Sequence, residues 1–256
     1  MKDKKIAQTN LIRLGLLDPP ADGVWGKQSQ AALEHFQIEY GLQEGDLSAV
    51  QPKALNCGSD LAGRIVSYMM KQGYWLPKGG RLYSIVYLEG ANADGAPNPD
   101  RFNEWNDRRI ILEVDEKPQI VGNWLATTEP GATYTYNPMN PGGAFRIAFG
   151  QYKAWQFGLH GRTQYPALVQ CNPVRGHRDK NKDGLRTADS LVEGLFGINQ
   201  HHGWDEGLVN GNSAGCLVGQ SIEGHRSFLK FLKTDRRYQV NPDYRFYTTI
   251  IAADQL

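Results

Sequence analysis

Residues 197–219 read GINQHHGWDEGLVNGNSAGCLVG, and this stretch joins a histidine, a glycine-rich loop and a cysteine that ends a turn of small residues. A cysteine nucleophile needs a base for its thiol proton and backbone N–H groups for the oxyanion formed when it attacks a carbonyl. His201 follows a short apolar run, and Ser213, Ala214 and Gly215 precede Cys216. The alternative is a small core residue, because free cysteine is among the most buried residue types.

On both sides of this stretch the pattern predicts strands. Short runs rich in β-branched and aromatic residues alternate with Gly, Pro, Asn and Asp between residues 82 and 203. One late helix is expected at residues 224–238, where Phe228, Leu229 and Leu232 recur at helical spacing. We therefore expect a mostly antiparallel β domain with one or two helices over residues 82–256.

The first 58 residues predict a small helical module instead. Residues 6–17 carry one apolar helical face, residues 18–26 are rich in turn residues, and a second helix runs from Ser29 to Gly41. We expect a three-helix module at residues 1–58 and a partly helical connector at residues 59–81. The fold class is therefore predicted to be α+β.

Composition excludes several classes of function. The chain has 256 residues with 40% hydrophobic residues, and its net charge of +1 argues against a nucleic-acid or anionic-membrane partner. No apolar run approaches the roughly 18 residues of a membrane span. Residues 1–15 lack the apolar segment of a signal peptide, so we expect another export route or a missing leader. Three cysteines cannot all pair, so at least one thiol is free in a monomer, which is the oligomeric state that we expect.

The N-terminal module resembles the peptidoglycan-binding domain found at the ends of many cell-wall enzymes. The main matching feature is a DG-x-x-G turn followed by a helix that carries Phe-Gln. The matching residues are Leu14-Gly15, Asp22-Gly23, Gly26, Ser29, Ala32, Phe36-Gln37 and Gly41-Leu42. The resemblance implies that peptidoglycan is a binding partner and that the protein lies at the cell envelope or outside the cell.

The stretch at residues 197–219 resembles the S-x-G-C signature of L,D-transpeptidase catalytic domains, which are β-rich cysteine enzymes that act on peptidoglycan stem peptides. NPGGAFRIAFG, residues 140–150, looks like the proline-glycine turn of the same family. The resemblance covers residues 82–235 and is strongest at residues 197–219. It implies cysteine acyl-enzyme chemistry without a metal or an organic cofactor.

Carried over position by position, the resemblance assigns a role to five residues. Cys216 becomes the nucleophile, attacking as a thiolate with a lowered pKa, and His201 becomes its base. Ser213 and Gly215 shape the turn, and the N–H groups of Gly215 and Cys216 are the expected oxyanion donors. The carbonyl of His202 would orient His201, or the His202 side chain would be a competing base; strand alternation predicts opposite faces for the two histidines.

This chain departs from the family pattern at two positions. Ala214 stands where many members have a bulky basic residue or a histidine, and Val218 stands where an Arg or Asn is usual. The usual contact with the substrate is therefore in doubt, and we treat Arg178, Arg146 and Ala214 as the candidate substrate-binding residues.

Several functions stay open on the sequence alone. Transfer to an amine acceptor and hydrolysis by water both follow from a cysteine acyl-enzyme. A peptidoglycan-binding protein that kept the fold and lost activity is an alternative, and so is a phage-type lysin peptidase.

The sequence also offers two candidate metal sites. Asp179, Asn181 and Asp183 precede Gly184 like half of a calcium loop, but Ser190 occupies the twelfth position, where a carboxylate is needed. A zinc peptidase is the second alternative, although its ligands would lack a known spacing and would come from His160, His177, His201, His202 and Asp179.

Overall fold

The computed structural model describes residues 4–13, 16–40 and 57–256, which fall into two compact units. Unit 1 comprises Met1–Tyr83, Glu113–Gln119 and Leu232–Tyr244, and unit 2 comprises Ser84–Leu112, Ile120–Phe231 and Arg245–Leu256. The described part of the chain holds six α-helices and a large, mostly antiparallel β-sheet, so the predicted α+β class is confirmed. No helix within these residues is long and apolar enough to cross a membrane.

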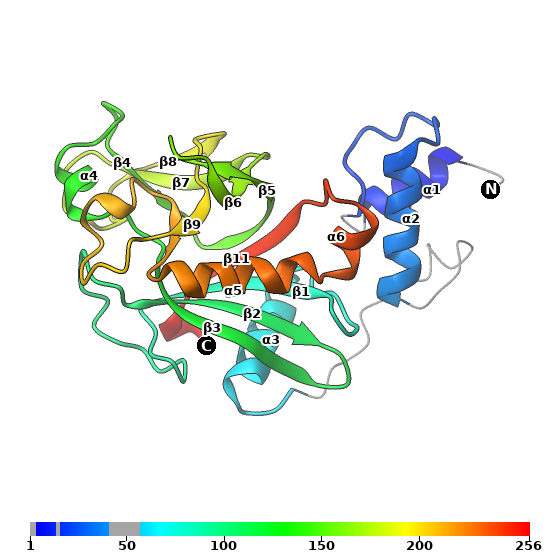
Figure 1. The fold of residues 1–256 in the computed structure, drawn as a ribbon, viewed down its shortest axis with the longest axis horizontal. Helices are drawn as coiled ribbons and strands as arrows, with labels where there is room; N and C mark the ends of the chain where they lie inside the picture. Colours follow the sequence, from blue (N-terminus) through cyan, green and yellow to red (C-terminus); the bar gives the residue numbers. More distant parts are fainter. Residues whose placement is uncertain (1–3, 14–15, 41–56) are drawn as a thin grey trace. The chain divides into compact units, whose positions relative to one another are not determined.

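Two helices open unit 1, α1 (Lys4–Arg13) and α2 (Lys27–Tyr40) (Figure 1). They share one small core, which consists of Ala7, Leu11, Leu16, Ala32, Leu33 and Phe36. The third predicted helix, together with the Leu14-Gly15 and Gly41-Leu42 matches, lies outside the described residues. The predicted module is therefore matched only in its first two helices.

A buried glutamine fixes the turn between these two helices. The Gln8 Nε2 lies within hydrogen-bond distance of Asp22 Oδ1 (2.9 Å), the Val24 carbonyl (3.0 Å) and Ser29 Oγ (3.0 Å). Its Oε1 accepts from the Gly23 N–H at 2.7 Å. Gly23 has a φ of +83°, which favours glycine. The Asp-Gly pair of the DG-x-x-G turn therefore has a structural role.

Two further helices lie in unit 1. Helix α3 (Leu61–Lys71) falls in the predicted connector, and the Asp60 carboxylate caps it by accepting from the Gly63 N–H at 2.8 Å. The late helix, predicted as one element, is two: α5 (Ile222–Lys233), most of which lies in unit 2, ends before α6 (Arg236–Val240), which lies in unit 1. Asp235 explains the break, because its extended backbone and its carboxylate form the N-cap of α6.

A closed barrel forms the main sheet, with the strand order β1-β11-β5-β6-β9-β10-β3-β2. The β1–β11 and β9–β10 pairs are parallel. The β3–β10, β5–β11, β5–β6 and β6–β9 pairs are antiparallel. The barrel strands are β1 (Tyr83–Glu89), β2 (Asp107–Val114), β3 (Pro118–Thr127), β5 (Gly150–His160), β6 (Tyr165–Gln170), β9 (Gln200–His202), β10 (Leu217–Gly219) and β11 (Phe246–Ala252).

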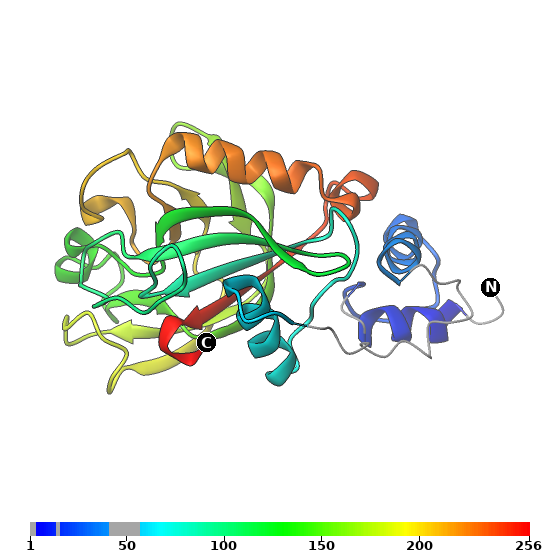
Figure 2. The ribbon, with the colours of Figure 1, turned by 90° about the horizontal axis from the view of Figure 1, so that it is seen from below.

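Smaller elements complete unit 2. A separate three-stranded sheet has the order β4-β7-β8, with β4 (Ala144–Ile147), β7 (Val174–Asp179) and β8 (Ser190–Gly194). Helix α4 (Ala132–Tyr136) and a 3₁₀ turn at Asn210–Asn212 flank the loop before β10. Helix α5 runs along strand β3 (Figure 2), where the Trp124 and Phe228 rings meet edge to face at 6.2 Å.

The run LFGINQHHG at residues 195–203 predicts a strand, and the observed strand β9 is shorter than this run. Of residues 195–203 only Gln200–His202 are in a strand. The Gln170 Oε1 accepts from the N–H groups of Phe196 (3.1 Å) and Ile198 (2.9 Å), so those groups bond to a side chain rather than to a neighbouring strand. The backbone therefore enters β9 from an irregular segment whose conformation a side chain holds.

Candidate active site

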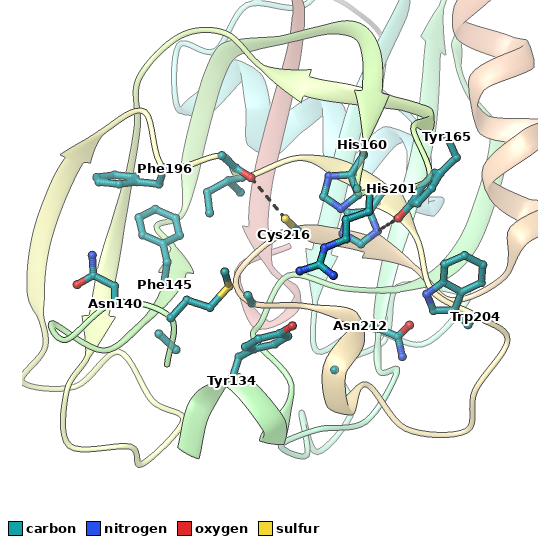
Figure 3. A pocket seen from close by; sticks show the side chains of 18 of the residues that line it. Tyr134, Asn140, Phe145, His160, Tyr165, Phe196, His201, Trp204, Asn212 and Cys216 are labelled. Atoms are coloured by element: carbon teal, nitrogen blue, oxygen red, sulfur yellow. Dashed lines mark hydrogen bonds between the residues drawn. The ribbon is translucent and has the colours of Figure 1, made fainter. Parts of the chain in front are cut away.

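Cys216 and His201 line the same cleft, which has a volume of about 610 Å³ (Figure 3). Strands β9 and β10 position them: the strands run parallel, and Val218 lies opposite His201. Because side chains alternate along a strand, Cys216, two residues before Val218, points to the same side as His201. The Leu217 N–H extends this pairing by donating to the Asn199 carbonyl at 2.9 Å. The cleft has the size of a small-molecule or peptide site.

The His201 ring is held through its Nδ1 atom. Nδ1 lies 2.8 Å from the His202 carbonyl oxygen and 3.2 Å from the Tyr165 hydroxyl. A carbonyl can only accept, so Nδ1 carries the ring proton of the neutral imidazole and Nε2 is left with its lone pair. The contact expected between the His202 carbonyl and His201 is present, and the resulting tautomer is the one that a general base needs.

Burial leaves both members of the pair uncharged at rest. It lowers the pKa of His201 to about 3 and raises the pKa of Cys216 to about 11. Around the sulfur, the Asn199 N–H donates to Sγ at 3.4 Å and the thiol donates to the Gly197 carbonyl at 3.6 Å. The expectation of a thiolate with a lowered pKa is therefore wrong. The resting thiol keeps its proton because burial of the sulfur disfavours the charged thiolate.

The turn before the cysteine has the expected shape and one unexpected contact. The Ser213 hydroxyl donates to the Cys216 carbonyl at 2.9 Å, and the Gly215 N–H donates to Ser213 Oγ at 3.1 Å. Gly215 has a φ of +123°, and a Cβ there would collide with the Phe145 carbonyl. Because the Gly215 N–H already donates to Ser213 Oγ, it is not free to donate to an oxyanion. The Cys216 N–H has no hydrogen-bond partner among the described residues and remains the expected donor.

The second histidine lies on the other side of the strand, as alternation predicted. His202 is buried but does not line the cleft. Its Nδ1 lies 2.6 Å from the Gly203 carbonyl, and its ring packs against Tyr165 at 4.2 Å between centroids. This position disfavours the His202 side chain as a competing base and leaves its carbonyl as the part that contacts His201.

The three candidate substrate-binding residues lie in different surroundings. Arg178 and Ala214 line the cleft. Arg146 does not: it is buried, and it forms ion pairs with Glu89 at 3.0 Å and with Glu129. We therefore drop Arg146 as a substrate-binding residue, because its guanidinium already has carboxylate partners.

Sequence reasoning missed two side chains that line the cleft beside the base. The His160 ring stacks on His201 with centroids 4.1 Å apart and an interplanar angle of 12°. The Asn199 amide nitrogen lies 2.8 Å from His160 Nδ1. Tyr165, on β6, reaches Nδ1 of His201 with its hydroxyl. His160 was considered only as a zinc ligand, and no local motif marks Tyr165.

A buried arginine connects the two strands that carry the site. The Arg109 Nη2 donates to the carbonyls of His201 and Leu217, both at 2.9 Å, and its Nη1 lies 3.1 Å from His225 Nδ1. These contacts hold the strand ends of β9 and β10 in register beneath the cleft. The sequence carries no signal for this role.

The histidines of the zinc alternative do not gather at one point. Among the described residues, the group of metal-ligating side chains close enough to hold one ion consists of Glu89, Asp100 and Glu129. It contains no histidine, and Arg146 and Arg186 form ion pairs with Glu89.

The loop considered for calcium is closed by its own hydrogen bonds. The Asp179 carboxylate accepts from the N–H groups of Asp183 (3.2 Å) and Gly184 (3.0 Å). The Asn181 amide donates to Asp183 at 2.7 Å. These contacts form a polar turn, which is the alternative to a calcium loop on the sequence pattern.

Comparison with known proteins adds one finding about the N-terminus. A family model of a peptidoglycan binding domain matches residues 2–47. This part of the chain is similar to peptidoglycan-binding domains. Comparison with the curated proteins gives no match, and neither does comparison with the solved structures. The N-terminal resemblance is thus confirmed, and it is consistent with a protein associated with the cell wall; the chemistry of the second unit depends on the geometry of its cleft.

Proposed function

We propose that this protein is a cell-wall enzyme that acts on peptidoglycan stem peptides through a cysteine acyl-enzyme, in the manner of L,D-transpeptidases. One observation carries the proposal: the His202 carbonyl holds the His201 ring with Nε2 unprotonated, in the cleft that Cys216 lines. The matching domain at residues 2–47 supports peptidoglycan as the substrate polymer.

The reaction begins from a neutral thiol and a neutral imidazole. As the Cys216 sulfur attacks the carbonyl carbon of the diamino-acid residue at position three, His201 Nε2 takes the thiol proton. The Cys216 N–H donates to the oxyanion. The carbon–nitrogen bond then breaks, the departing D-amino acid takes the proton from His201, and a thioester remains on Cys216.

The group that attacks the thioester decides whether the enzyme is a transferase or a hydrolase. An amine acceptor that attacks the thioester gives a new cross-link, and water gives a trimmed peptide. In both cases His201 removes a proton from the attacking group and returns it to the sulfur. The peptidoglycan-binding domain raises the local concentration of this cleft at the wall.

Three features of Cys216 and its surroundings favour a non-catalytic alternative. The Cys216 thiol donates to the Gly197 carbonyl, the pKa of Cys216 is raised to about 11, and Val218 replaces the residue that L,D-transpeptidases use after the cysteine. In that alternative the second unit only contributes to binding. A phage-type lysin peptidase would use the same cysteine and would differ in giving hydrolysis products alone.

Muropeptide analysis separates these alternatives. The full chain is incubated with soluble muropeptides, with and without an added D-amino acid, and products are identified by mass spectrometry. We predict exchanged, cross-linked or trimmed peptides with the wild type and with Cys171→Ala, whose half-buried cysteine lies outside the cleft. Cys216→Ala should give none. Identical products from Cys216→Ala and wild type would overturn the proposal, and no products from either would favour the binding protein.

A further inference from the structure

The walls of the cleft carry positive charge. Arg162 and Arg178 line it, and among the described residues that line it there is no Asp or Glu. The whole chain has a net charge of only +1, so this excess is local. A cleft with two cations and no carboxylate of its own suits an anionic ligand.

Arg178 is the cation that the fold holds in place. It extends from β7, and its Cζ lies 5.0 Å from the Phe196 ring and 5.4 Å from the Phe145 ring. Those two rings pack against each other at 4.8 Å between centroids. One Nη1 hydrogen bond, to the Gly143 carbonyl at 3.2 Å, fixes the guanidinium further.

This guanidinium has no carboxylate within ion-pair distance among the described residues. Arg146 and Arg186, also buried in part, both pair with Glu89. Aromatic faces attract a cation but leave its N–H groups unsatisfied, and a guanidinium has five of them in a fork that matches a carboxylate. A partly desolvated arginine with unused donors thus faces the cleft.

The position of the leaving group relative to His201 indicates which carboxylate of the substrate lies beside Arg178. Figure 3 shows Phe145 and Phe196 on one side of Cys216, with His160, His201 and Tyr165 on the other. The departing amine must take its proton from His201, so the leaving residue lies on the histidine side. The acyl part of the substrate therefore extends toward the two phenylalanines and Arg178.

We propose that Arg178 binds a free side-chain carboxylate on the acyl donor, so that the cleft selects stem peptides whose third residue is a diamino diacid with that carboxylate unmodified. This proposal rests on the proposed function, since it assumes that Cys216 is acylated. Arg178 is a specificity-determining residue in it.

The test compares four tetrapeptide donors with the full-length protein. The third residue is 2,6-diaminopimelic acid, its side-chain carboxamide or lysine, and the fourth donor keeps the free acid but has a C-terminal carboxamide. Acylation of Cys216 is followed by intact mass to give kcat/KM. The wild type should prefer the free acid over its side-chain carboxamide and over lysine by about 10- to 100-fold, the effect of one charge-assisted pair. C-terminal amidation should change the rate far less.

Two variants assign the preference to Arg178. Arg178→Gln should lower kcat/KM for the free acid to the level of the carboxamide in the same variant, and a urea unfolding curve like that of the wild type shows that the variant is folded. Arg178→Lys should keep part of the preference. Arg175→Gln is the matched control, because Arg175 is exposed on the same strand and does not line the cleft.

Three results would overturn the proposal while leaving the proposed function intact. They are equal wild-type rates for all four donors, an equal loss for every donor in Arg178→Gln, and a preference that follows the C-terminal carboxylate. If no donor acylates Cys216 in the wild type, the proposed function itself fails, which is a different and recognisable outcome.

Discussion

His201 and Cys216 are a neutral pair, and this sets how the thiol should react. The ring proton is on Nδ1, against the His202 carbonyl, and burial holds the pKa of His201 at about 3. Above that pH the imidazole is uncharged and its Nε2 accepts a proton. The Cys216 thiol, with its pKa raised to about 11, depends on that base when it attacks.

We therefore predict that Cys216 reacts slowly with simple alkylating agents at neutral pH. Iodoacetamide should modify the half-buried Cys57 and Cys171 first, and the rate at Cys216 should rise only as the pH approaches 11, since the thiolate is the nucleophile. Peptide mapping after timed labelling measures the three rates. Fastest labelling of Cys216 at pH 7 would show that the thiol carries a lowered pKa after all.

At the scale of elements, the turn before β10 requires a glycine at position 215, because there is no room for a Cβ there. Gly215→Ala should lower the free energy of unfolding by roughly 1–3 kcal/mol, because φ is +123° and a Cβ would meet the Phe145 carbonyl. Gly211→Ala is the matched control, since a Cβ there comes no closer than 3.9 Å to Thr133 Oγ1. Urea unfolding of both variants measures the difference. Equal stability would mean that the turn adjusts freely.

The elements that could be predicted from the sequence are those with a local signal. Apolar spacing marks α1 and α2, and runs of β-branched and aromatic residues mark the part of the chain after residue 82 as strands. The break between α5 and α6 was missed because Asp235 stands inside a pattern that reads as one helix. Strand β9 is shorter than predicted because the side chain of Gln170, on strand β6, accepts hydrogen bonds from two N–H groups that precede β9 in the chain.

The candidate site likewise contains residues that a local motif marks and residues that only the fold brings together. A contiguous motif marks Cys216, His201 and the Ser213 turn, and the structure places Cys216 and His201 in one cleft. Arg109 and His160 reach the site from other strands through contacts between residues far apart in sequence, and no local pattern encodes such contacts. The thiol pKa was mispredicted for a related reason, since burial of the sulfur depends on packing that the sequence does not display.

At the scale of the whole molecule, the peptidoglycan-binding domain should matter for the polymer and not for small substrates. Gln8→Ala removes the side chain that fixes the Asp22-Gly23 turn, so it should weaken retention on insoluble peptidoglycan. Turnover of the polymer should fall with it, while turnover of soluble muropeptides should stay within about twofold. Pull-down and product analysis of the full-length variant measure both.

Thr9→Ala is the control for that variant, because Thr9 is exposed and its hydroxyl donates to the Lys5 carbonyl one turn earlier in the same helix. It should bind and turn over peptidoglycan like the wild type. An equal loss on polymer and on soluble peptides in Gln8→Ala would contradict a tethering role.

The most direct test of the central claim is the intact mass of the full-length protein after incubation with a stem tetrapeptide. We predict that the wild type gains the mass of the tetrapeptide less the mass of the released D-amino acid, as a thioester on Cys216. His201→Ala should lose this acylation by about 10²–10⁴-fold, the range of a positioned general base, while His202→Ala should keep most of it because its carbonyl remains. Acylation by His201→Ala at the wild-type rate, or a wild type that never gains mass, would contradict the Cys216–His201 mechanism.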